Sequence, residues 1–493
     1  MKRKIFGKTA EAQRASRFAL GKPYTLLLLI VLFGLFLRLI FFSGMGISDS
    51  LEYSKTANDI NTGKGIDPES TLSLSTRLGL IYPTALSYKL FGINDFSSVL
   101  FVLLASIGSI ILIFYFGRLL FNEKIGLMAA FLMSFFPLDV VYATQLGSDI
   151  PSAFFMALGA YVFLYAEMKR KMKYGLDYML SGILIGMGYM IRESALLIAL
   201  FFIAYIVYKR KIKRGYFLVP LGVLMIFAIE SFIFFALTGD PIYRVVFSQQ
   251  YNAKAVIEHN YFGRLDFPTG LLHYPWLFLT NSLLTYFYAF VLIALVYVLI
   301  KRRKEAYIML IWLIPLLLYL SFGSASLAQY IPFRAVDRYT SVFTVPAIIL
   351  LAFFLSEKRA MIKKWIMPIT LAFLLLASIG AVYVRENRHL LDNLRDVSPF
   401  LKGLDKAVFI DDRSLAAINY LSGYAINKNL NEYPDSLDKV KDSYIAINRH
   451  MIRSLKEANP KVKFPEEIEN IPKEWIAIKE FGSSENDKIV IYQ

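Results

Sequence analysis

The sequence predicts a mainly α-helical, polytopic transmembrane bundle of about eleven spans, followed by a small α/β domain outside the membrane. Three observations support this prediction. Of the 493 residues, 56% are hydrophobic and the mean hydropathy is +0.50, more than a soluble domain needs to fill its core. The apolar residues form repeated runs long enough to cross a bilayer. After about residue 385 these runs stop, and the composition becomes that of a soluble chain.

The positive charge is distributed as expected for cytoplasmic loops. The net charge is +16, and most of the excess lies in short basic clusters between the apolar runs. Basic residues interleaved with stacking aromatics on a soluble face are absent from the sequence, so we expect no nucleic-acid binding. The chain has no cysteine, which excludes disulfides, thiolate metal sites and cysteine nucleophiles.

The first span is expected at residues 24–42, after a basic N-terminal segment. Its nineteen residues suffice to cross the hydrocarbon, and no small-residue cleavage site follows, so we expect an uncleaved helix and no signal peptide. With every basic cluster placed in the cytoplasm, ten more spans follow at about residues 97–116, 125–141, 150–166, 176–191, 195–208, 216–237, 284–300, 306–321, 339–355 and 365–384. This topology puts the N-terminus in the cytoplasm and the C-terminal domain outside the cell (plasma) membrane.

Three outer segments are long enough to hold structure, at about residues 43–96, 238–283 and 322–337. The first contains "SLEYSKTANDI", whose pattern predicts an amphipathic helix on the membrane surface. The fifth and sixth spans are short and meet at residues 192–194, so we expect their turn to line a cavity within the membrane's depth.

The sequence divides into a transmembrane domain, residues 1–384, and an extracytoplasmic α/β domain, residues 385–493. In the second domain, "KAVFIDD" and "DSYIAINR" predict strands followed by short helices, and "EWIAIKEFGSSENDKIVIYQ" predicts a closing hairpin with a Gly-Ser turn. Asp411 and Asp412, after the first strand, can bind a cation or a sugar, or can lie in a solvated turn.

Ionisable residues gather near the predicted outer face of the membrane. Charge near hydrocarbon is costly unless it is paired or hydrated, so these residues indicate a functional cavity. They are Asp49 after the first span, Asp149 before the fourth, Arg192 and Glu193 between the fifth and sixth, and Arg334, Asp337 and Arg338 before the tenth. All of them project to one side at similar depth.

A carboxylate at this boundary can act as a general base toward an acceptor hydroxyl, and Asp49 is the predicted base. The structural alternative for Asp49 is the N-cap of the amphipathic helix. For Asp149, a role in the site and a helix start before Pro151 both stay open.

Arginines at the outer helix ends can hold a phosphate, because the planar guanidinium pairs bidentately with phosphate oxygens. The alternatives are that Arg338 snorkels or pairs with Asp337, and that Arg192 pairs with Glu193. His259 and His273 show no ligand spacing, so we predict no metal site.

At these residues the sequence resembles the GT-C superfamily of membrane glycosyltransferases, in particular the branch of protein O-mannosyltransferases and lipid A aminoarabinose transferases. The resemblance covers roughly residues 24–384. "SDSLEYSKTANDINTGKG" is similar to that family's first outer loop, although Ser50 stands where the usual acidic pair has its second member. "ATQLGSDIPSAFF" is similar to the segment before its fourth span, "GYMIRESALL" to its paired short helices, and "DRYTSVF" to its late Arg-Tyr motif.

The resemblance implies transfer, with inversion, of a hexosyl or pentosyl sugar from a polyprenyl or dolichyl phosphate donor. The acceptor is a hydroxyl of a protein, glycolipid or glycan at the outer membrane face. It implies Asp49 and Asp149 as catalytic residues, with arginine stabilising the leaving phosphate and no cofactor or metal ion. The residues expected to bind substrate are Glu52, Tyr53, Arg192, Glu193, His259, Arg334, Arg338 and Tyr339.

Two other classes of function stay open. A transporter or flippase of a lipid-linked or polar solute also places charges within the membrane. Its charges are expected near the midplane and its chain in paired halves, whereas these charges lie at one surface and no internal repeat is found. A receptor or scaffold would use the spans only as an anchor, for which about eleven are excessive.

Overall fold

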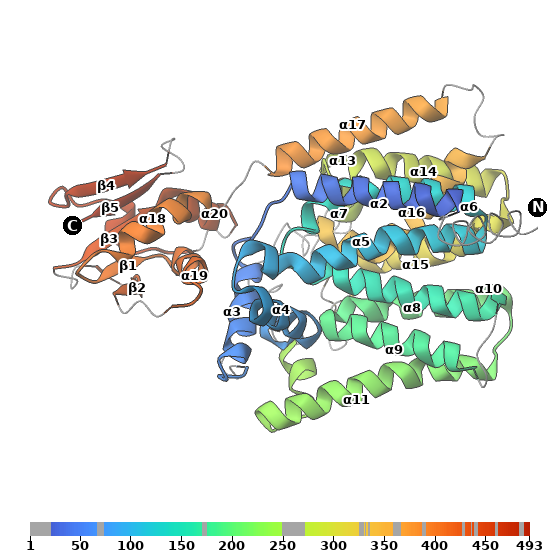
Figure 1. Ribbon diagram of the computed structural model, residues 1–493, viewed down its shortest axis with the longest axis horizontal. Helices are drawn as coiled ribbons and strands as arrows, with labels where there is room; N and C mark the ends of the chain where they lie inside the picture. The colour runs from blue at the N-terminus through green and yellow to red at the C-terminus, as the bar shows by residue number, and fades with distance from the viewer. Residues whose placement is uncertain are drawn as a thin grey trace, which may run out of the picture.

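The computed structural model describes residues 21–66, 73–169, 175–248, 272–324, 330, 332–333, 336–357, 366–386, 391–425, 429–434, 436–437, 442–458, 462–482 and 488–493. A bundle of long helices forms one part of the molecule, and a small sheet domain lies beyond one end of it (Figure 1). The mainly α-helical fold with a small C-terminal α/β domain is confirmed.

The bundle is built from helices of very different length. They are α2 (Lys22–Ile40), α5 (Asp95–Leu120), α6 (Glu123–Ser134), α7 (Pro137–Tyr142), α8 (Asp149–Lys169), α9 (Leu176–Ile191), α10 (Ile198–Lys209), α11 (Leu218–Thr238), α13 (His273–Thr280), α14 (Thr285–Ile300), α15 (Tyr307–Phe322), α16 (Ser341–Ser356) and α17 (Ile366–Glu386). Four of them begin with a short 3-10 turn: η3 (Glu193–Leu197), η4 (Arg214–Phe217), η7 (Lys304–Ala306) and η8 (Asp337–Thr340).

Seven of the described helices are long and apolar enough to cross a membrane, or eight if α13 and α14, bent by 118° at their break, form one span. Helices lie at all the predicted positions, but the count of eleven spans is not confirmed. The reason is length, because α6 and α10 have 12 residues each and α9 has 16, whereas a crossing needs about 20. The predicted span at residues 125–141 is interrupted before Pro137, which has no N–H to continue the helix.

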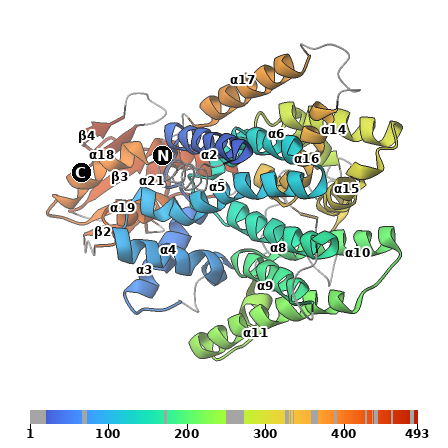
Figure 2. The same ribbon diagram turned by 45° about the vertical axis from the view of Figure 1, so that its right-hand side comes forward.

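Glycines let the helices of the bundle approach closely. A Cβ atom on Gly182 of α9 would lie 1.9 Å from the carbonyl oxygen of Val219 on α11. In a membrane, lipid provides no hydrophobic driving force between helices, so they associate through close van der Waals packing at small residues such as these glycines. α16 is buried along nearly its whole length, whereas α11 and α17 lie at opposite edges of the bundle and expose apolar side chains (Figures 1 and 2).

Two helices cover the end of the bundle nearest the sheet domain. They are α3 (Asp49–Asn61) and α4 (Leu78–Phe91), joined in part by the 3-10 turn η1 (Ser73–Thr76). The predicted helix in "SLEYSKTANDI" is confirmed as α3, which packs against α4 with Leu51, Tyr53 and Ala57 buried.

The C-terminal domain alternates strands and helices. Its elements are α18 (Asp392–Lys402), β1 (Val408–Ile410), α19 (Asp412–Leu421), β2 (Leu430–Glu432), β3 (Tyr444–Asn448), α20 (Arg449–Ala458), α21 (Glu466–Glu469), β4 (Ala477–Phe481) and β5 (Ile489–Tyr492). The strand order is β2-β1-β3-β5-β4, with β1 parallel to β2 and β3, and β5 antiparallel to β3 and β4.

Both predicted strand-helix units of this domain and its closing hairpin are present. The tip of the hairpin, residues 483–487, lies outside the described residues. Strand β2 was not predicted, because its three residues are too few to show an alternating pattern. The domain boundary at residue 384 stays a prediction, since α17 ends at Glu386 and residues 387–390 are not described.

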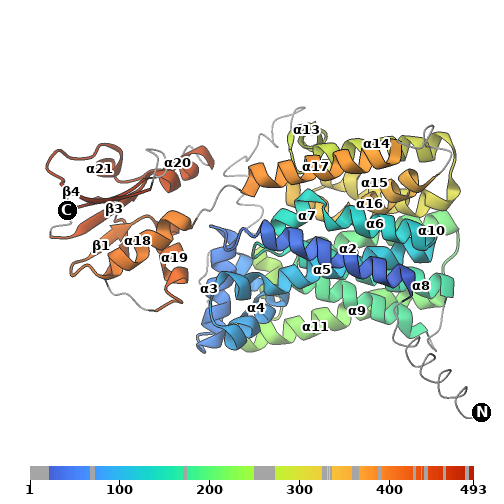
Figure 3. The same cartoon turned by 45° about the horizontal axis from the view of Figure 1, so that its top comes forward.

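The C-terminal domain packs on the end of the bundle through α19, which lies beside α3 (Figures 1 and 3). One apolar cluster contains Leu394 and Ile418 of this domain together with Leu51 of α3, Tyr88 of α4 and Val99 of α5. The two domains therefore share a hydrophobic core around α3.

Candidate active site

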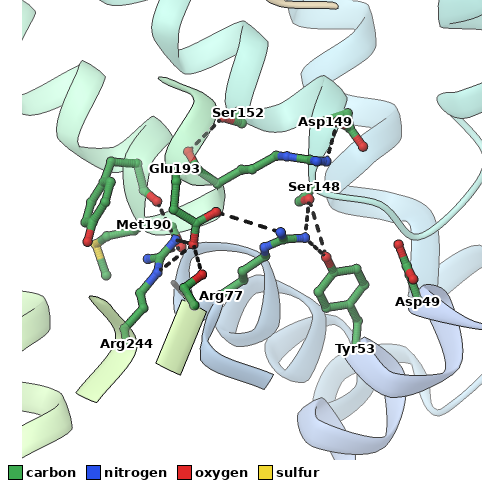
Figure 4. A network of polar contacts seen from close by, with 12 residues as sticks. Asp49, Tyr53, Arg77, Ser148, Asp149, Ser152, Met190, Glu193 and Arg244 are labelled. Carbon is green, nitrogen blue, oxygen red and sulfur yellow. Dashed lines mark hydrogen bonds and ion pairs between the residues drawn. The ribbon is translucent and has the colours of Figure 1, made fainter. Parts of the chain in front are cut away.

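A cluster of charged side chains lies where α3 and α4 meet the helix ends of the bundle (Figures 1 and 4). Separate segments of the chain contribute to it: the start of α3, the residue before α4, the start of α8, the break between α9 and η3, and the turn η8. Its members come from elements far apart in sequence, as the predicted convergence requires.

Asp49 is the first residue of α3, and the residue that precedes the helix as its N-cap is Ser48. The Asp49 carboxylate is therefore not the N-cap of this helix. It accepts a hydrogen bond from Arg338 over 2.7 Å. Ser48 has φ +88° and ψ −120°, a conformation that L-residues rarely adopt, and this backbone strain lies directly beside the proposed base.

Arg338 connects the two predicted catalytic carboxylates. Its second contact is to Asp149 at 3.5 Å, and the other oxygen of Asp149 pairs with Arg192. The guanidinium of Arg192 lies over the ring of Tyr339, 4.5 Å from its centroid. The alternatives in which Arg338 pairs with Asp337 and Arg192 with Glu193 are wrong, because both arginines pair with carboxylates of distant segments.

Arg77 forms the second half of the cluster, and the sequence analysis missed it. It donates hydrogen bonds to the hydroxyl of Tyr53 and, over 3.1 Å, to that of Ser148, and it lies 3.7 Å from Glu193 (Figure 4). A signal was present in the sequence, since an arginine on the predicted outer side of the membrane departs from the usual cytoplasmic excess of basic residues.

Arg244 is a further arginine that the sequence analysis missed. It pairs with Glu193 at 2.9 Å and with Glu230 of α11, and it donates a hydrogen bond of 2.8 Å to the carbonyl of Tyr189. Glu230 is an acidic residue within an apolar run, and such a residue in a predicted span marks a partner inside the protein.

The charges of the cluster control its protonation. Burial alone would raise the pKa of Asp49, but attraction to Arg338, with smaller contributions from Arg77 and Arg192, holds it below its usual value. Burial likewise opposes ionisation of Glu193, yet Arg244 and Arg77 lower its pKa to about 2. Both carboxylates are therefore ionised at neutral pH.

Exposure separates the residues that can meet a substrate from those that support them. The side chains of Asp49, Arg338 and Glu193 are 33%, 30% and 35% exposed. Arg77, Arg192 and Asp149 are nearly buried. The cluster thus presents the Asp49 carboxylate and the Arg338 guanidinium side by side, with Glu193 as a second partly exposed carboxylate, over a layer of nearly buried charges.

The structure brings together seven of the predicted site residues: Asp49, Tyr53, Asp149, Arg192, Glu193, Arg338 and Tyr339. Glu52 is half-buried on α3, and its role stays a prediction. His259 and Arg334 lie outside the described residues. Among the side chains that the structure describes, no group of three or more His, Asp and Glu residues could hold a metal ion.

The comparisons with known proteins concern the fold that carries this site. A family model described as dolichyl-phosphate-mannose-protein mannosyltransferase matches residues 78–235. The structure of ArnT from Cupriavidus metallidurans bound to undecaprenyl phosphate superposes with a TM-score of 0.62, covering 94% of this chain and 97% of that one at 12% identity. The chain has a GT-C glycosyltransferase fold. The resemblance inferred from the sequence is confirmed at this level. The seven or eight described helices that are able to cross a membrane, together with this fold, make the chain an integral membrane protein.

Two further solved structures share the GT-C fold. Apo ArnT from the same organism has a TM-score of 0.59 and 13% identity, with 94% of this chain and 97% of that chain covered. The oligosaccharyltransferase AglB from Archaeoglobus fulgidus, in complex with an inhibitory peptide and a dolichol-phosphate, has a TM-score of 0.52 and 13% identity, with 87% and 70% covered. A search of curated protein sequences finds no match.

Proposed function

We propose that this chain transfers a sugar, with inversion, from a polyprenyl or dolichyl phosphate donor to an acceptor hydroxyl at the outer membrane face. The observation that supports this most strongly is the partly exposed pair of Asp49 and Arg338, 2.7 Å apart and backed by buried arginines. Two GT-C neighbours were solved with undecaprenyl phosphate and dolichol-phosphate, which supports a lipid phosphate as the donor group.

In the proposed reaction, Asp49 accepts the proton of the acceptor hydroxyl while the hydroxyl oxygen attacks the anomeric carbon. The bond between that carbon and the phosphate oxygen breaks, and the lipid phosphate leaves with its negative charge. Arg338 stabilises this charge by charge-assisted hydrogen bonds. Attack from the side opposite the leaving phosphate inverts the configuration of the sugar.

Donor binding would also activate the base. In the resting state, Arg338 donates to Asp49 and lowers its pKa. A phosphate that takes hydrogen bonds from Arg338 competes with this pair, so the pKa of Asp49 rises and the carboxylate becomes a stronger base. The reaction would then begin only when the donor is in place.

Asp149 serves a supporting role in this mechanism. Its two oxygens contact Arg192 and Arg338, and its side chain is almost buried, so it has no free face for an acceptor. It holds both arginines in position by pairing their charges. Arg77 plays a comparable part on the other side, where it fixes Tyr53 beside Asp49.

Several features of the proposal come from the resemblance and the pattern of charges. They are a hexosyl or pentosyl donor sugar, an acceptor on a protein, glycolipid or glycan, a cytoplasmic N-terminus and an extracytoplasmic C-terminal domain. The position of the charged cluster at the helix ends supports an enzyme over a transporter, whose charged site is expected near the midplane.

The test is the transfer of sugar from a lipid-linked donor by the purified chain and its Asp49→Asn variant, which keeps the shape of the side chain and removes the base. General-base catalysis contributes about 10²–10⁴-fold, so kcat should fall by at least about 100-fold. Asp59→Asn is the matched control, because Asp59 lies on the same helix and pairs only with Lys55 and Lys64 among the described ion pairs. Full activity of the Asp49→Asn variant would reject Asp49 as the base.

A further inference from the structure

A chain of hydroxyl groups crosses the boundary between the C-terminal domain and the bundle. Tyr424 donates a hydrogen bond of 2.9 Å to Ser54 of α3, and Ser54 lies 2.6 Å from the hydroxyl of Tyr88 on α4. Tyr88 lies 2.8 Å from Ser98 of α5, which in turn lies 3.0 Å from the hydroxyl of Tyr420. The chain therefore begins and ends on tyrosines of the C-terminal domain and passes through three helices of the bundle.

The last hydroxyl of this series, that of Tyr420, is bonded to a carboxylate, and this sets the direction of the hydrogen bonds. Tyr420 donates to Asp95 over 2.8 Å, and the second oxygen of Asp95 accepts from Arg395 of α18. Each hydroxyl has one hydrogen, so with Tyr424 donating at one end and Tyr420 at the other, the contacts between them fit one order. Ser54 donates to Tyr88 and Tyr88 to Ser98, whose hydrogen lies between Tyr420 and the carbonyl of Asn94.

Because these hydroxyl groups are buried, the loss of one of their hydrogen bonds would leave a polar group unpaired. Ser54, Ser98, Tyr88 and Tyr420 are all buried, so no bulk water replaces a lost partner. A buried polar network that is fully satisfied specifies one arrangement of its elements, and breaking it leaves polar groups unpaired. The network is therefore a specific joint between domains, in addition to the apolar core they share.

The backbone of Tyr424 has an unfavourable conformation, which its contact with Ser54 accompanies. Its φ is +59°, in the left-handed region that a bulky side chain rarely adopts, and it follows Gly423, which has φ +64°. A strained backbone persists only where the surroundings over-determine it. Here the strain places the Tyr424 hydroxyl on Ser54.

The same helix carries the proposed base. Ser54 is five residues after Asp49 on α3, and its neighbour Tyr53 is bonded to Arg77 in the charged cluster. One side of α3 is thus held by the site and an adjacent side by the C-terminal domain. Because a shift of about 1 Å in a catalytic group can cost about 100-fold in rate, anything that holds α3 also sets the reach of Asp49.

We propose that the C-terminal domain positions α3, and through it Asp49, by means of Tyr420 and Tyr424. This proposal rests on the proposed function for its catalytic consequence, but the positioning itself is a structural property. Tyr420 and Tyr424 are positioning residues, since neither touches the charged cluster in the described contacts.

The test uses pairs of spin labels, for which the absence of native cysteine is an advantage. Labels on Lys55→Cys of α3 and Lys402→Cys of α18 report the distance between the C-terminal domain and α3. Labels on Lys55→Cys and Lys124→Cys of α6 report the distance between α3 and the bundle. All three lysines are exposed.

The perturbation is the double variant Tyr420→Phe with Tyr424→Phe, measured in the full chain in lipid. Both distance distributions should broaden. The kcat should fall about tenfold with the KM for the donor unchanged, because a displacement of Asp49 by less than about 1 Å costs part of the roughly 100-fold that a misplacement of about 1 Å costs. Tyr433→Phe is the control, because the Tyr433 hydroxyl donates to the carbonyl of Ala446 within the C-terminal domain. That variant should leave the distances and kcat unaltered.

A distribution between α3 and the bundle that stays narrow in the double variant would overturn the proposal, whatever the activity. Broadened distances with an unchanged kcat would overturn the catalytic consequence. If the double variant does not fold, Tyr424→Phe alone gives the same comparison. Failure of the unmodified chain to transfer sugar would reject the proposed function, while the label pairs would still decide the positioning.

Discussion

Replacing Arg338 by glutamine should move the acid limb of the pH-rate profile to higher pH. Burial raises the pKa of Asp49, and attraction to Arg338 is the main effect that lowers it again. Without this charge the carboxylate takes up a proton at higher pH, and a protonated Asp49 cannot accept the proton of the acceptor. The rate therefore begins to fall at a higher pH as the solution is acidified.

The size of the shift follows from the geometry. Two unit charges about 4 Å apart attract by about 4 kcal/mol at an effective dielectric constant of about 20. The side chains of Asp49 and Arg338 are 33% and 30% exposed, and such exposure permits solvent screening. Screening reduces the attraction to roughly 1–2 kcal/mol. Since about 1.4 kcal/mol corresponds to one pKa unit, we expect the limb to move by about one pH unit.

The assay is the initial rate of sugar transfer in proteoliposomes, measured across the range in which carboxylates titrate. Arg118→Gln is the matched control, because Arg118 pairs with Glu123 at the opposite end of α5 from the charged cluster. The Arg338→Gln variant should also lose rate at every pH, since the phosphate loses its guanidinium. A profile that loses height without moving along the pH axis would refute the role of Arg338 in setting the basicity of Asp49.

Two predictions concern stability. Gly182→Ala should lower the melting temperature, because the added Cβ would meet the carbonyl oxygen of Val219 and overpacking costs about 1–3 kcal/mol. Gly380→Ala is the control: its added Cβ would have no atom within 4 Å, so this variant should not lower the melting temperature. Burial raises the pKa of Asp411 to about 6, so the native state favours its protonated form and its contribution to stability is lost as pH rises from about 4 to about 6. In the Asp411→Asn variant, the side-chain oxygen still accepts the hydrogen bond from the Ser414 N–H, but the side chain cannot ionise. This variant should therefore have a higher melting temperature than the unmodified chain at about pH 8 but not at about pH 4. Equal melting temperatures of the two proteins at both pH values would contradict this prediction.

The sequence predicted a site residue best where the position of that residue within one segment is enough to place it in the fold. Asp49, Arg192, Glu193 and Arg338 follow from charges at the ends of apolar runs, and Tyr53 follows from the resemblance of the first outer loop to the GT-C family. Arg77 and Arg244 were not predicted as site residues, because their place in the site depends on ion pairs with residues far apart in the sequence. Arg77 meets Glu193 of the α9–η3 break, a contact that no local pattern encodes.

The number of spans and the hydrogen bonds between the two domains could not be predicted from the sequence, for related reasons. Apolar runs show that a helix is buried, but they do not show whether a helix such as α10, with 12 residues, crosses lipid or packs inside protein. Tyr420 and Tyr424 resemble ordinary aromatic residues of a soluble domain in the sequence. Only their hydrogen bonds to α3 and α5 reveal that they join the two domains.

The most direct test of the central claim is an experimental structure of the chain with undecaprenyl phosphate bound. We predict that the phosphate lies within hydrogen-bonding distance of Arg338, in place of the Asp49 carboxylate, and that Asp49 faces the space where the anomeric carbon of a donor would lie. A phosphate bound on another face of the bundle, out of reach of Arg338, Arg192 and Arg77, would contradict the account.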